Sequence, residues 1–391
     1  MKITGVITEY NPFHNGHEYQ LGKIREQGAD YIVAVMSGDF TQRGEAAIVD
    51  KYDRTRMALM AGVDLVIELP VLYACSDAKR FAKGGVSILN SLGCIDEIAF
   101  GIEEGSASFV SEVAGLLACP PADYSETFDR LIRSGLSYPE ARAQALSAYF
   151  DETDLQYLNG SNAILAIEYL MTLSQLDSDI KPLMIERKGG LYNDSSLEAA
   201  GFSSATAIRE ALNNESDLSS LALHMPSTSL EIMNNAHVLF PDDFSSLLHY
   251  KLITEDSYEA YTDITEAFSN RLADKRNDYE SLSLFIDTVK SKNITRTSVS
   301  RLLCHILLDM RINEPATVPY ARILGFKKNS SELLSAIGKS SNIPLISKLA
   351  DADMNDCLAM DIKASDIYAS AVCHKYGIKQ KNEYTRGIVI I

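Results

Sequence analysis

Short apolar strands and helices alternate through the first hundred residues, and this order constrains the fold more than any other feature of the chain. Strands are expected at residues 3–9, 31–36, 65–69 and 97–100, and helices at 17–27, 51–62 and 81–92. The run 31–36 is apolar throughout, which is typical of a strand buried on both faces of a parallel sheet. The pattern therefore predicts an α/β fold, a doubly wound parallel sheet with right-handed crossovers.

The loops that follow these strands are the expected place for a ligand. Doubly wound sheets bind their ligands outside the carboxyl ends of the strands. The loops 10–16, 37–44 and 101–105 all fall at that edge. We therefore expect them to border one site.

The remainder of the chain has a different pattern. A late strand is expected at residues 182–186 and helices at 162–173 and 203–212, and beyond residue 226 the pattern is helical until a strand-like end at 388–390. A single core stops growing near about 250–300 residues. The 391 residues therefore predict two domains, an α/β domain at 1–220 and a mainly α-helical domain at 221–391.

Charge is distributed unevenly along the chain. The overall net charge of −17 argues against a nucleic-acid binder. Residues 271–391, however, carry 18 Lys and Arg against 13 Asp and Glu, whereas residues 1–270 carry 18 against 40. This asymmetry suggests a C-terminal part that faces a polyanion, and ordinary surface variation explains it equally well.

Two observations bear on the cellular compartment. No apolar run approaches the roughly 20 residues of a membrane span, and a cleavable signal peptide would remove the first strand and the motif that follows it. The six cysteines show no CxxC spacing, which favours reduced thiols over disulfides or a zinc site. We expect a cytoplasmic protein without a membrane partner.

The turn His14-Asn15-Gly16-His17 is the strongest local signal for chemistry. Gly16 has no Cβ to keep a phosphate away from the backbone, and the helix that begins here favours an anion through its free N–H groups and its dipole. Two histidines can donate hydrogen bonds to phosphate oxygens as charge develops. The alternative is a helix cap with two solvated histidines, but the position after the first strand favours phosphate. We predict His14 and His17 to be catalytic.

This turn resembles the HxGH signature of the Rossmann-like nucleotidyltransferase superfamily. A second signature of that group, a Ser/Thr-rich turn before a helix that ends in Arg, is similar to residues 203–209. Serines at this place are also ordinary helix N-caps. The resemblance makes four residues possible phosphate ligands, namely Ser203, Ser204, Thr206 and Arg209.

Longer blocks of sequence resemble one family in this superfamily, the tRNA-Met cytidine acetate ligases. The long blocks are residues 8–17, 36–45, 61–70 and 100–105, and the shorter ones are 161–165, 185–187, 295–297, 321–326 and 382–386. The resemblance therefore extends over nearly the whole chain. The sequence departs from the family pattern at Ser161, where Pro is usual, and at Ile102, where Ser is frequent.

The resemblance implies a two-step, ATP-dependent ligase reaction. ATP and acetate form acetyl-adenylate with release of pyrophosphate, and the wobble cytidine of elongator tRNA-Met then takes the acetyl group to give N4-acetylcytidine and AMP. Mg²⁺ is expected to accompany ATP without direct protein ligands, and no prosthetic group is expected. The ATP-binding residues of the family correspond here to Ile7, Thr8, Glu9, Tyr10, Asn11, Pro12, Phe13, His14, Asn15, Gly16, His17, Glu18, Tyr19, Gln20, Gly101, Asn162 and Arg187.

Further basic residues are candidates for contact with the RNA backbone. Arg43 and Lys51 follow the second strand, where they could reach RNA or phosphate, and Arg296 and Arg322 lie in the basic C-terminal part. Ordinary surface charge explains each of them equally well. Asn162, similarly, is either a ligand of the nucleotide or acetate or the cap of its own helix.

Two other functions compete with the ligase. The first is a small-molecule adenylyltransferase of the same superfamily, although those enzymes tend to be much shorter. The second is a non-catalytic nucleotide- or RNA-binding protein, which the intact histidine pair and the turn at 203–209 speak against. The basic C-terminal part favours tRNA as the partner, with residues 1–220 binding ATP and 221–391 binding tRNA.

Overall fold

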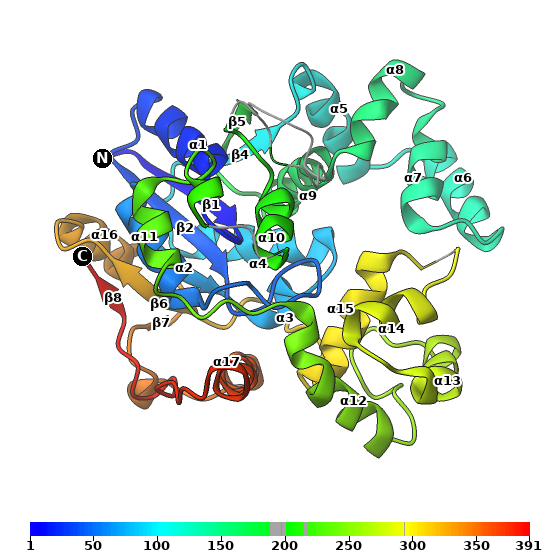
Figure 1. Cartoon of the computed structure of the whole chain (residues 1–391). Coiled ribbons are helices and arrows are strands. Elements are labelled where there is room, and N and C mark those ends of the chain that lie inside the picture. The colour runs from blue at the N-terminus through cyan, green and yellow to red at the C-terminus, as the bar shows by residue number, and fades with distance from the viewer. Residues whose placement is uncertain (188–196, 198–200, 215–217, 293) are drawn as a thin grey trace.

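The computed structural model describes residues 1–187, 197, 201–214, 218–292 and 294–391. In this part of the chain eight strands form one sheet in the order β5-β4-β1-β2-β3-β6-β7, with β8 paired to β6. The first five strands are mutually parallel and coincide with the strands predicted from the alternating pattern. The doubly wound α/β fold is therefore confirmed (Figure 1). These strands are β1 (Ile3–Thr8), β2 (Tyr31–Ser37), β3 (Leu65–Leu69), β4 (Glu97–Ile102) and β5 (Lys181–Glu186).

The C-terminal part of the chain completes the same sheet. β6 (Ala321–Phe326) pairs antiparallel with β3, while β7 (Leu345–Ile346) and β8 (Val389–Ile390) pair with β6. The sequence pattern predicts β8 but misses β6 and the two-residue β7, because periodicity alone does not distinguish a short run among helices from a helix segment. A domain boundary near residue 220 stays a prediction, and the sheet takes strands from both sides of it.

Helices cover both faces of the sheet, as the alternation of side chains along each strand requires. On β2, for example, Val35 belongs to the core on one face and Met36 to the core on the other. The Met36 face is covered by α1 (Asn15–Glu26), α2 (Lys51–Met60), α10 (Ala205–Asn213) and α11 (Ser227–Met233). The Val35 face is covered by α3 (Val71–Ala74), α4 (Ala78–Ser91), α9 (Ser161–Gln175), α16 (Ser331–Ser340) and α17 (Asp356–Tyr376).

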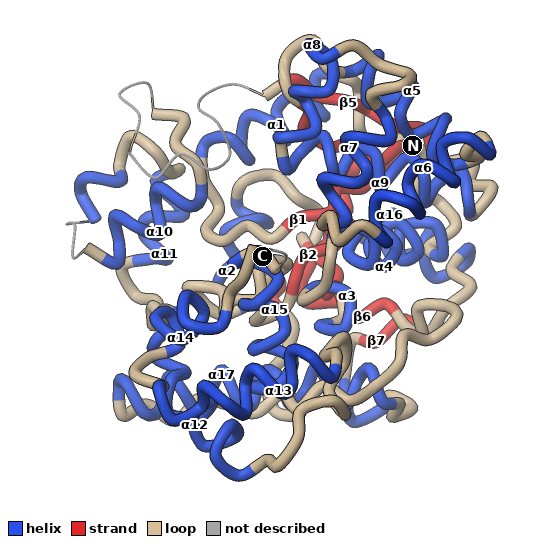
Figure 2. Tube along the Cα trace, turned by 90° about the vertical axis from the view of Figure 1, so that its right-hand side faces the viewer, coloured by secondary structure: helices blue, strands red, loops and turns tan. Residues whose placement is uncertain are grey.

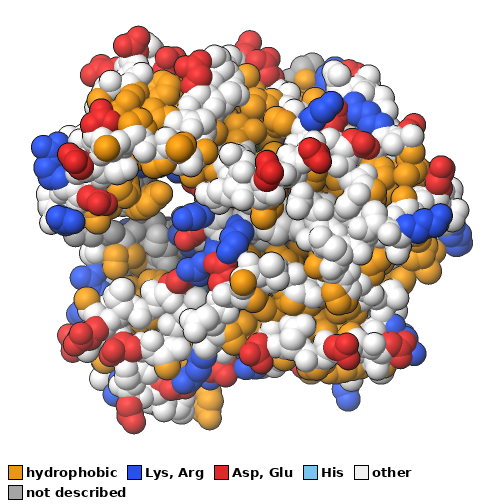
Figure 3. All heavy atoms as spheres, turned by 180° about the vertical axis from the view of Figure 1, so that it is seen from behind, with side chains coloured by type: hydrophobic (Ala, Val, Ile, Leu, Met, Phe, Trp, Pro, Cys, Tyr) orange, Lys and Arg blue, Asp and Glu red, His pale blue; other side chains and the backbone are white. Residues whose placement is uncertain are grey.

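The other helices form two separate groups, one at the upper right and one at the lower right of Figure 1, and Figure 2 shows the same groups toward the top and the bottom of the molecule. The upper group consists of α5 (Ala107–Ala118), α6 (Ala122–Arg133), α7 (Tyr138–Leu146) and α8 (Glu152–Leu155), and the lower group of α12 (Ser245–Thr254), α13 (Glu266–Lys275), α14 (Leu282–Val289) and α15 (Arg296–Leu307). Across the described residues, no helix combines the length and apolar character needed to cross a bilayer. On the face shown in Figure 3, basic and acidic side chains are intermixed.

A buried ion cluster joins α2, β3, β6 and the C-terminal segment. The Nζ atom of Lys51 lies 2.8 Å from a carboxylate oxygen of Glu68 and 2.8 Å from one of Glu383. Arg322 pairs with the same two carboxylates, its Nη1 lying 3.0 Å from Glu68. All four residues are at most 5% exposed. We call these four residues the buried ion cluster, and they tie the C-terminal segment to the sheet.

The loop between β2 and α2 packs against α15 at Gly44. The φ of Gly44, 75°, lies in the left-handed region, and the Gly44 carbonyl accepts a hydrogen bond of 2.9 Å from Ser300 Oγ. A Cβ at this position would lie 2.3 Å from the backbone nitrogen of Arg301. Only glycine therefore permits this close approach.

We expect Gly44→Ala to lower the free energy of unfolding by about 2–4 kcal/mol, because it adds backbone strain and a clash with another backbone. Gly28→Ala is the matched control, since Gly28 has a similar φ of 86° with no atom within 4 Å of a Cβ. The control isolates the strain, about 1–2 kcal/mol. Chemical denaturation of the two variants measures the difference, and equal losses would contradict the packing argument.

Candidate active site

A cleft opens at the carboxyl edge of the sheet, between the α1/α10 layer and the α4/α9 layer. Its empty space is about 1260 Å³ with the open mouth included, and it lies where doubly wound sheets bind their ligands. The residues predicted for ATP that line it are Ile7, Thr8, Glu9, Tyr10, Asn11, His14, Gly16, His17, Tyr19, Gln20, Gly101, Asn162 and Arg187. Three of the four possible phosphate ligands also line it, namely Ser203, Thr206 and Arg209.

The two histidines of the HxGH turn stack on each other at the start of α1. Their ring centroids are 3.7 Å apart. The Nδ1 atom of His14 accepts the backbone N–H of Gly16 at 3.0 Å, and the Nδ1 of His17 accepts the backbone N–H of His14 at 3.3 Å. The histidines therefore form a reciprocal helix cap and line the cleft at the same time. The capping role, which the sequence offered as an alternative to ligand binding, is therefore compatible with ligand binding by the same two histidines.

The capping contacts decide where each ring carries its proton. Because both Nδ1 atoms accept a hydrogen bond, we assign the proton of each neutral ring to Nε2. Burial, together with the guanidinium groups of Arg187 and Arg209, lowers the pKa of His14 to about 3. Burial, His14 and Arg187 likewise lower the pKa of His17 well below its usual value. The site thus offers two neutral Nε2–H donors beside two cationic side chains.

Gly16 is needed for a reason that the sequence does not show. A Cβ on this residue would lie 2.9 Å from Cε1 of the His14 ring. Any other residue would therefore displace the imidazole from its capping position. The missing side chain of Gly16 therefore leaves room for the His14 ring as well as for a phosphate.

The turn at residues 203–209 lies on the same side of the cleft as the histidines. Arg209 donates a hydrogen bond of 2.8 Å to the carbonyl of Asn11, which ties α10 to the HxGH turn. Ser204 caps α10 by accepting the N–H of Ala207 at 3.0 Å and does not line the cleft, so for this residue the capping alternative is the one observed. Ser203 lines the cleft, with its Oγ 3.0 Å from Nδ1 of His224.

Four other predicted residues do not line the cleft, namely Pro12, Phe13, Asn15 and Glu18. The Asn15 side chain donates hydrogen bonds to the carbonyls of Gly201 at 3.0 Å and Leu223 at 2.8 Å. Phe13 is fully buried beside the rings of Tyr10 and His17. Glu18 is exposed on α1. Asn15 and Phe13 therefore position the turn.

Arg54 of α2 anchors this edge of the sheet and was not anticipated from the sequence. Its fully buried guanidinium donates to the carbonyls of Glu9 at 2.7 Å and Ser37 at 3.0 Å and also contacts Gly38. It thereby joins the loops that follow β1 and β2. Because all these acceptors are backbone atoms of distant segments, no local motif could reveal the role.

On the β4/β5 side, Gly101 and Arg187 lie face to face. A Cβ on Gly101 would lie 3.2 Å from Cγ of Arg187, so glycine leaves room for that side chain. Asn162 donates a hydrogen bond of 3.1 Å to Glu103. The N-cap of α9 is Gly160, so the alternative that Asn162 caps its own helix is wrong. The cleft residues that sequence reasoning missed are Gln42, Phe81, Phe100, Leu165, Tyr169, Ile185, Glu186, Phe202 and Ala205.

The candidate RNA-binding residues are not among the described residues that line the cleft. Arg322 belongs to the buried ion cluster and is 4% exposed, so the prediction that it contacts RNA is wrong, as is the same prediction for Lys51. Both cations are neutralised by the protein's own carboxylates. Arg296 is exposed and pairs with Asp287 at 2.7 Å. Arg43 is half-buried in the loop that follows β2.

Comparison with known proteins gives the same picture as the geometry. A family model described as HIGH Nucleotidyl Transferase matches residues 1–384. The chain is 38% identical over 382 residues to the tRNA(Met) cytidine acetate ligase of Clostridium novyi, covering 94% of this chain and 95% of that one. It is 39% identical over 393 residues to the enzyme of the same name from Caldicellulosiruptor saccharolyticus, covering 96% of each.

Solved structures agree over the full length. The crystal structure of apo Thermotoga maritima TmcAL superposes with a TM-score of 0.94 at 30% sequence identity, covering 100% of both chains. The same protein bound with alpha-thio ATP gives a TM-score of 0.91 at the same identity and coverage. The chain therefore belongs to the tRNA(Met) cytidine acetate ligase family of HIGH nucleotidyl transferases.

Proposed function

We propose that this protein is an ATP-dependent acetate ligase that forms N4-acetylcytidine at the wobble position of elongator tRNA-Met through an acetyl-adenylate. The observation that carries the proposal is the stacked pair His14 and His17, whose Nε2–H groups lie beside Arg187 and Arg209 in the cleft at the carboxyl edge of the sheet. Family membership and the nucleotide-bound relative support ATP as the substrate. With ATP and tRNA as substrates, the enzyme would act in the cytoplasm.

The first step activates acetate. A carboxylate oxygen of acetate attacks the α-phosphorus of ATP, the bond from that phosphorus to the bridging oxygen breaks, and pyrophosphate leaves. Negative charge builds up on the phosphate oxygens during this displacement. The Nε2–H groups of the two histidines would stabilise it as preorganised donors, and Arg187 and Arg209 would offset the charge of the triphosphate. Bound phosphate would also raise the pKa of both imidazoles, because an anion favours the charged form.

The second step transfers the acetyl group. The exocyclic amine of the wobble cytidine attacks the carbonyl carbon of acetyl-adenylate, the bond to the phosphate oxygen breaks, AMP leaves, and the amine releases one proton. This step requires an unstacked anticodon base to enter the cleft, as is usual for proteins that read single-stranded RNA. Arg43 and Arg296 remain proposed contacts to the tRNA backbone.

Mg²⁺ is proposed to arrive with the nucleotide. Within the described ranges, no group of three or more His, Cys, Asp or Glu side chains is placed to hold a metal ion. The carboxylates that line the cleft are Glu9 and Glu186. Such a donor set fits an ion held mainly by phosphates and water, with at most one or two protein oxygens. When bound, the ion would neutralise phosphate charge.

The test is a reconstituted reaction with ATP, labelled acetate and elongator tRNA-Met transcripts. Label in the tRNA is expected only when all components are present, and replacing the wobble cytidine with uridine should abolish it. Acetate-dependent exchange of pyrophosphate into ATP measures the first step separately. Adenylation of a different small molecule without labelled tRNA would favour the small-molecule adenylyltransferase, and ATP binding without any turnover would refute an enzymatic role.

A further inference from the structure

The cleft has two chemically different sides. The two histidines and Arg209 belong to the α1/α10 layer, whereas five apolar residues close the opposite side from β1, α4, β4 and α9. We call this side the apolar wall, made of Ile7, Phe81, Phe100, Leu165 and Tyr169. It belongs to neither HxGH-type signature, and no residue of it except Ile7 was anticipated from the sequence.

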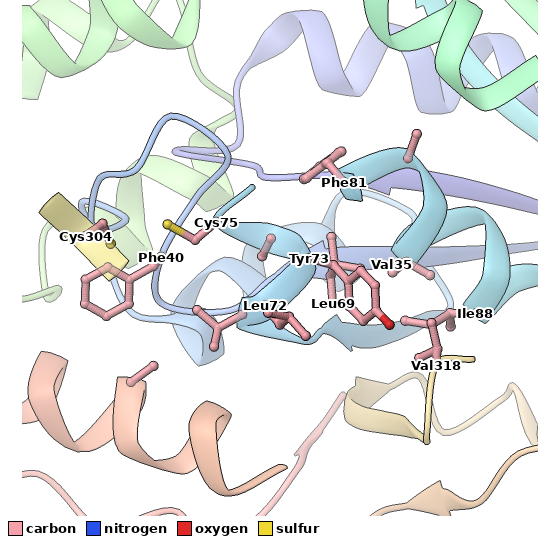
Figure 4. Packing of buried hydrophobic residues seen from close by; sticks show 14 of the residues in the cluster. Val35, Phe40, Leu69, Leu72, Tyr73, Cys75, Phe81, Ile88, Cys304 and Val318 are labelled. Carbon is pink, nitrogen blue, oxygen red and sulfur yellow. The ribbon is translucent and has the colours of Figure 1, made fainter. Parts of the chain in front are cut away.

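The rings of the apolar wall are fixed by the core behind them. Phe81, Phe100 and Tyr169 are 2%, 5% and 4% exposed, and all three belong to the core on the α4/α9 face. Phe100 and Tyr169 pack with their centroids 5.5 Å apart. Figure 4 shows Phe81 at the start of α4, at the margin of this core. A wall of buried aromatic rings in a close-packed core does not yield easily to a larger ligand.

The small exposed area of these three rings limits the size of the ligand group that they can contact. An adenine ring requires broad faces, and the rings that show more of their surface to the cleft are Tyr19 and Phe202, on the opposite side. Phe81, Phe100 and Tyr169 together offer only the edge of a recess. Such a recess suits a single methyl group.

We propose that the apolar wall is the subsite for the methyl group of acetate, and that Phe81 limits the length of the carboxylic acid that the enzyme activates. This inference rests on the proposed function. In the first step the carboxylate must face the α-phosphate, which the histidines and arginines hold, so the methyl group must point away from them. The wall is the side of the cleft where apolar side chains can cover a methyl group.

The magnitude of discrimination follows from the size of one methylene. A hydrophobic pocket separates substrates that differ by a methylene by roughly 10–200-fold. The wild-type enzyme should therefore prefer acetate to propionate by at least about tenfold in kcat/KM, because Phe81 leaves no room for the extra carbon. Truncating the ring opens that room.

The experiment measures pyrophosphate exchange with formate, acetate, propionate and butyrate for the full-length Phe81→Ala and Phe81→Leu variants. We expect the ratio of kcat/KM for propionate over acetate to rise at least about tenfold in Phe81→Ala and less in Phe81→Leu, with the KM for ATP unchanged. The milder Phe81→Leu substitution retains a testable variant if the alanine variant fails to fold.

The matched control is Phe109→Ala. Phe109 is 5% exposed in the same core, packs against Phe150 and Tyr157, and does not line the cleft. Its truncation should leave the acid preference of the wild type. An unchanged ratio in both Phe81 variants, or a raised KM for ATP instead, would assign the wall to another ligand and overturn the inference. If the wild type activates no carboxylic acid at all, the proposed function fails and the inference fails with it.

Discussion

Replacing His14 with alanine should lower the rate of adenylate formation by about 10²–10³-fold, which is the usual effect of removing one preorganised donor to a developing oxyanion. The reason is the loss of the Nε2–H that the capping contact directs toward the cleft. Acetate-dependent pyrophosphate exchange measures this rate directly. Because His14 also caps α1, the same variant should lose about 0.5–2 kcal/mol of stability.

His14→Asn separates the two roles of the histidine. Asparagine is among the best N-cap residues and can accept the same backbone N–H, but it lacks the second ring nitrogen. We therefore expect this variant to retain the stability of the wild type and to lose as much activity as the alanine variant. Exchange at the wild-type rate in His14→Asn would show that the ring acts only as a cap, and the mechanism proposed for the first step would be wrong.

Replacing Lys51 with methionine should lower the free energy of unfolding by about 3–5 kcal/mol, as expected when one partner of a buried ion pair is removed. Lys51 is 1% exposed and contacts Glu68 and Glu383, which would be left with Arg322 as the nearest cation of the cluster. Urea denaturation monitored by circular dichroism measures the loss. Because Glu383 lies far from Lys51 in the sequence, this loss of stability tests a contact that only the tertiary structure creates.

Lys290→Met is the matched control, since Lys290 is 51% exposed and pairs with the exposed Asp287 at 2.9 Å. Exposed pairs contribute about 0–1 kcal/mol, so this variant should be nearly as stable as the wild type. Equal losses in the two variants would show that the buried ion cluster has no special role.

Acid titration tests the same cluster from its anionic side. Although burial opposes it, Lys51 and Arg322 lower the pKa of Glu383 to about 2. A carboxyl group whose folded pKa lies below its unfolded value contributes stability above the unfolded pKa, and that stability is lost as the pH falls. The wild type should therefore lose stability between about pH 5 and 2, and Lys51→Met should lose less over that interval because part of the contribution is already gone.

Local patterns of the sequence sufficed for most of the sheet and for the centre of the site. The five parallel strands could be predicted because short, mostly apolar runs alternate with helical segments, a pattern typical of a parallel sheet covered by helices. The HxGH turn could be placed at the carboxyl edge because a strand ends before it and a helix begins at it. These features depend on residues that are neighbours in the chain.

The burial and the partners of individual charged residues could not be predicted in this way, because they depend on which distant segments of the chain come into contact. Lys51 and Arg322 looked like surface cations in the sequence, and only the arrival of Glu383 and Glu68 beside them makes them part of the core. Arg54 is likewise defined by backbone carbonyls from two separate loops. No short-range pattern encodes these encounters.

The sequence by itself thus determined the α/β order, the two histidines and the family, since these follow from local periodicity and from contiguous motifs. The tertiary structure alone decided that β6 extends the sheet beyond β3, that the two histidines cap their own helix through Nδ1, and that Phe81 borders the cleft. The physical reason is that side-chain environment, unlike backbone periodicity, is set by packing between segments far apart in the chain.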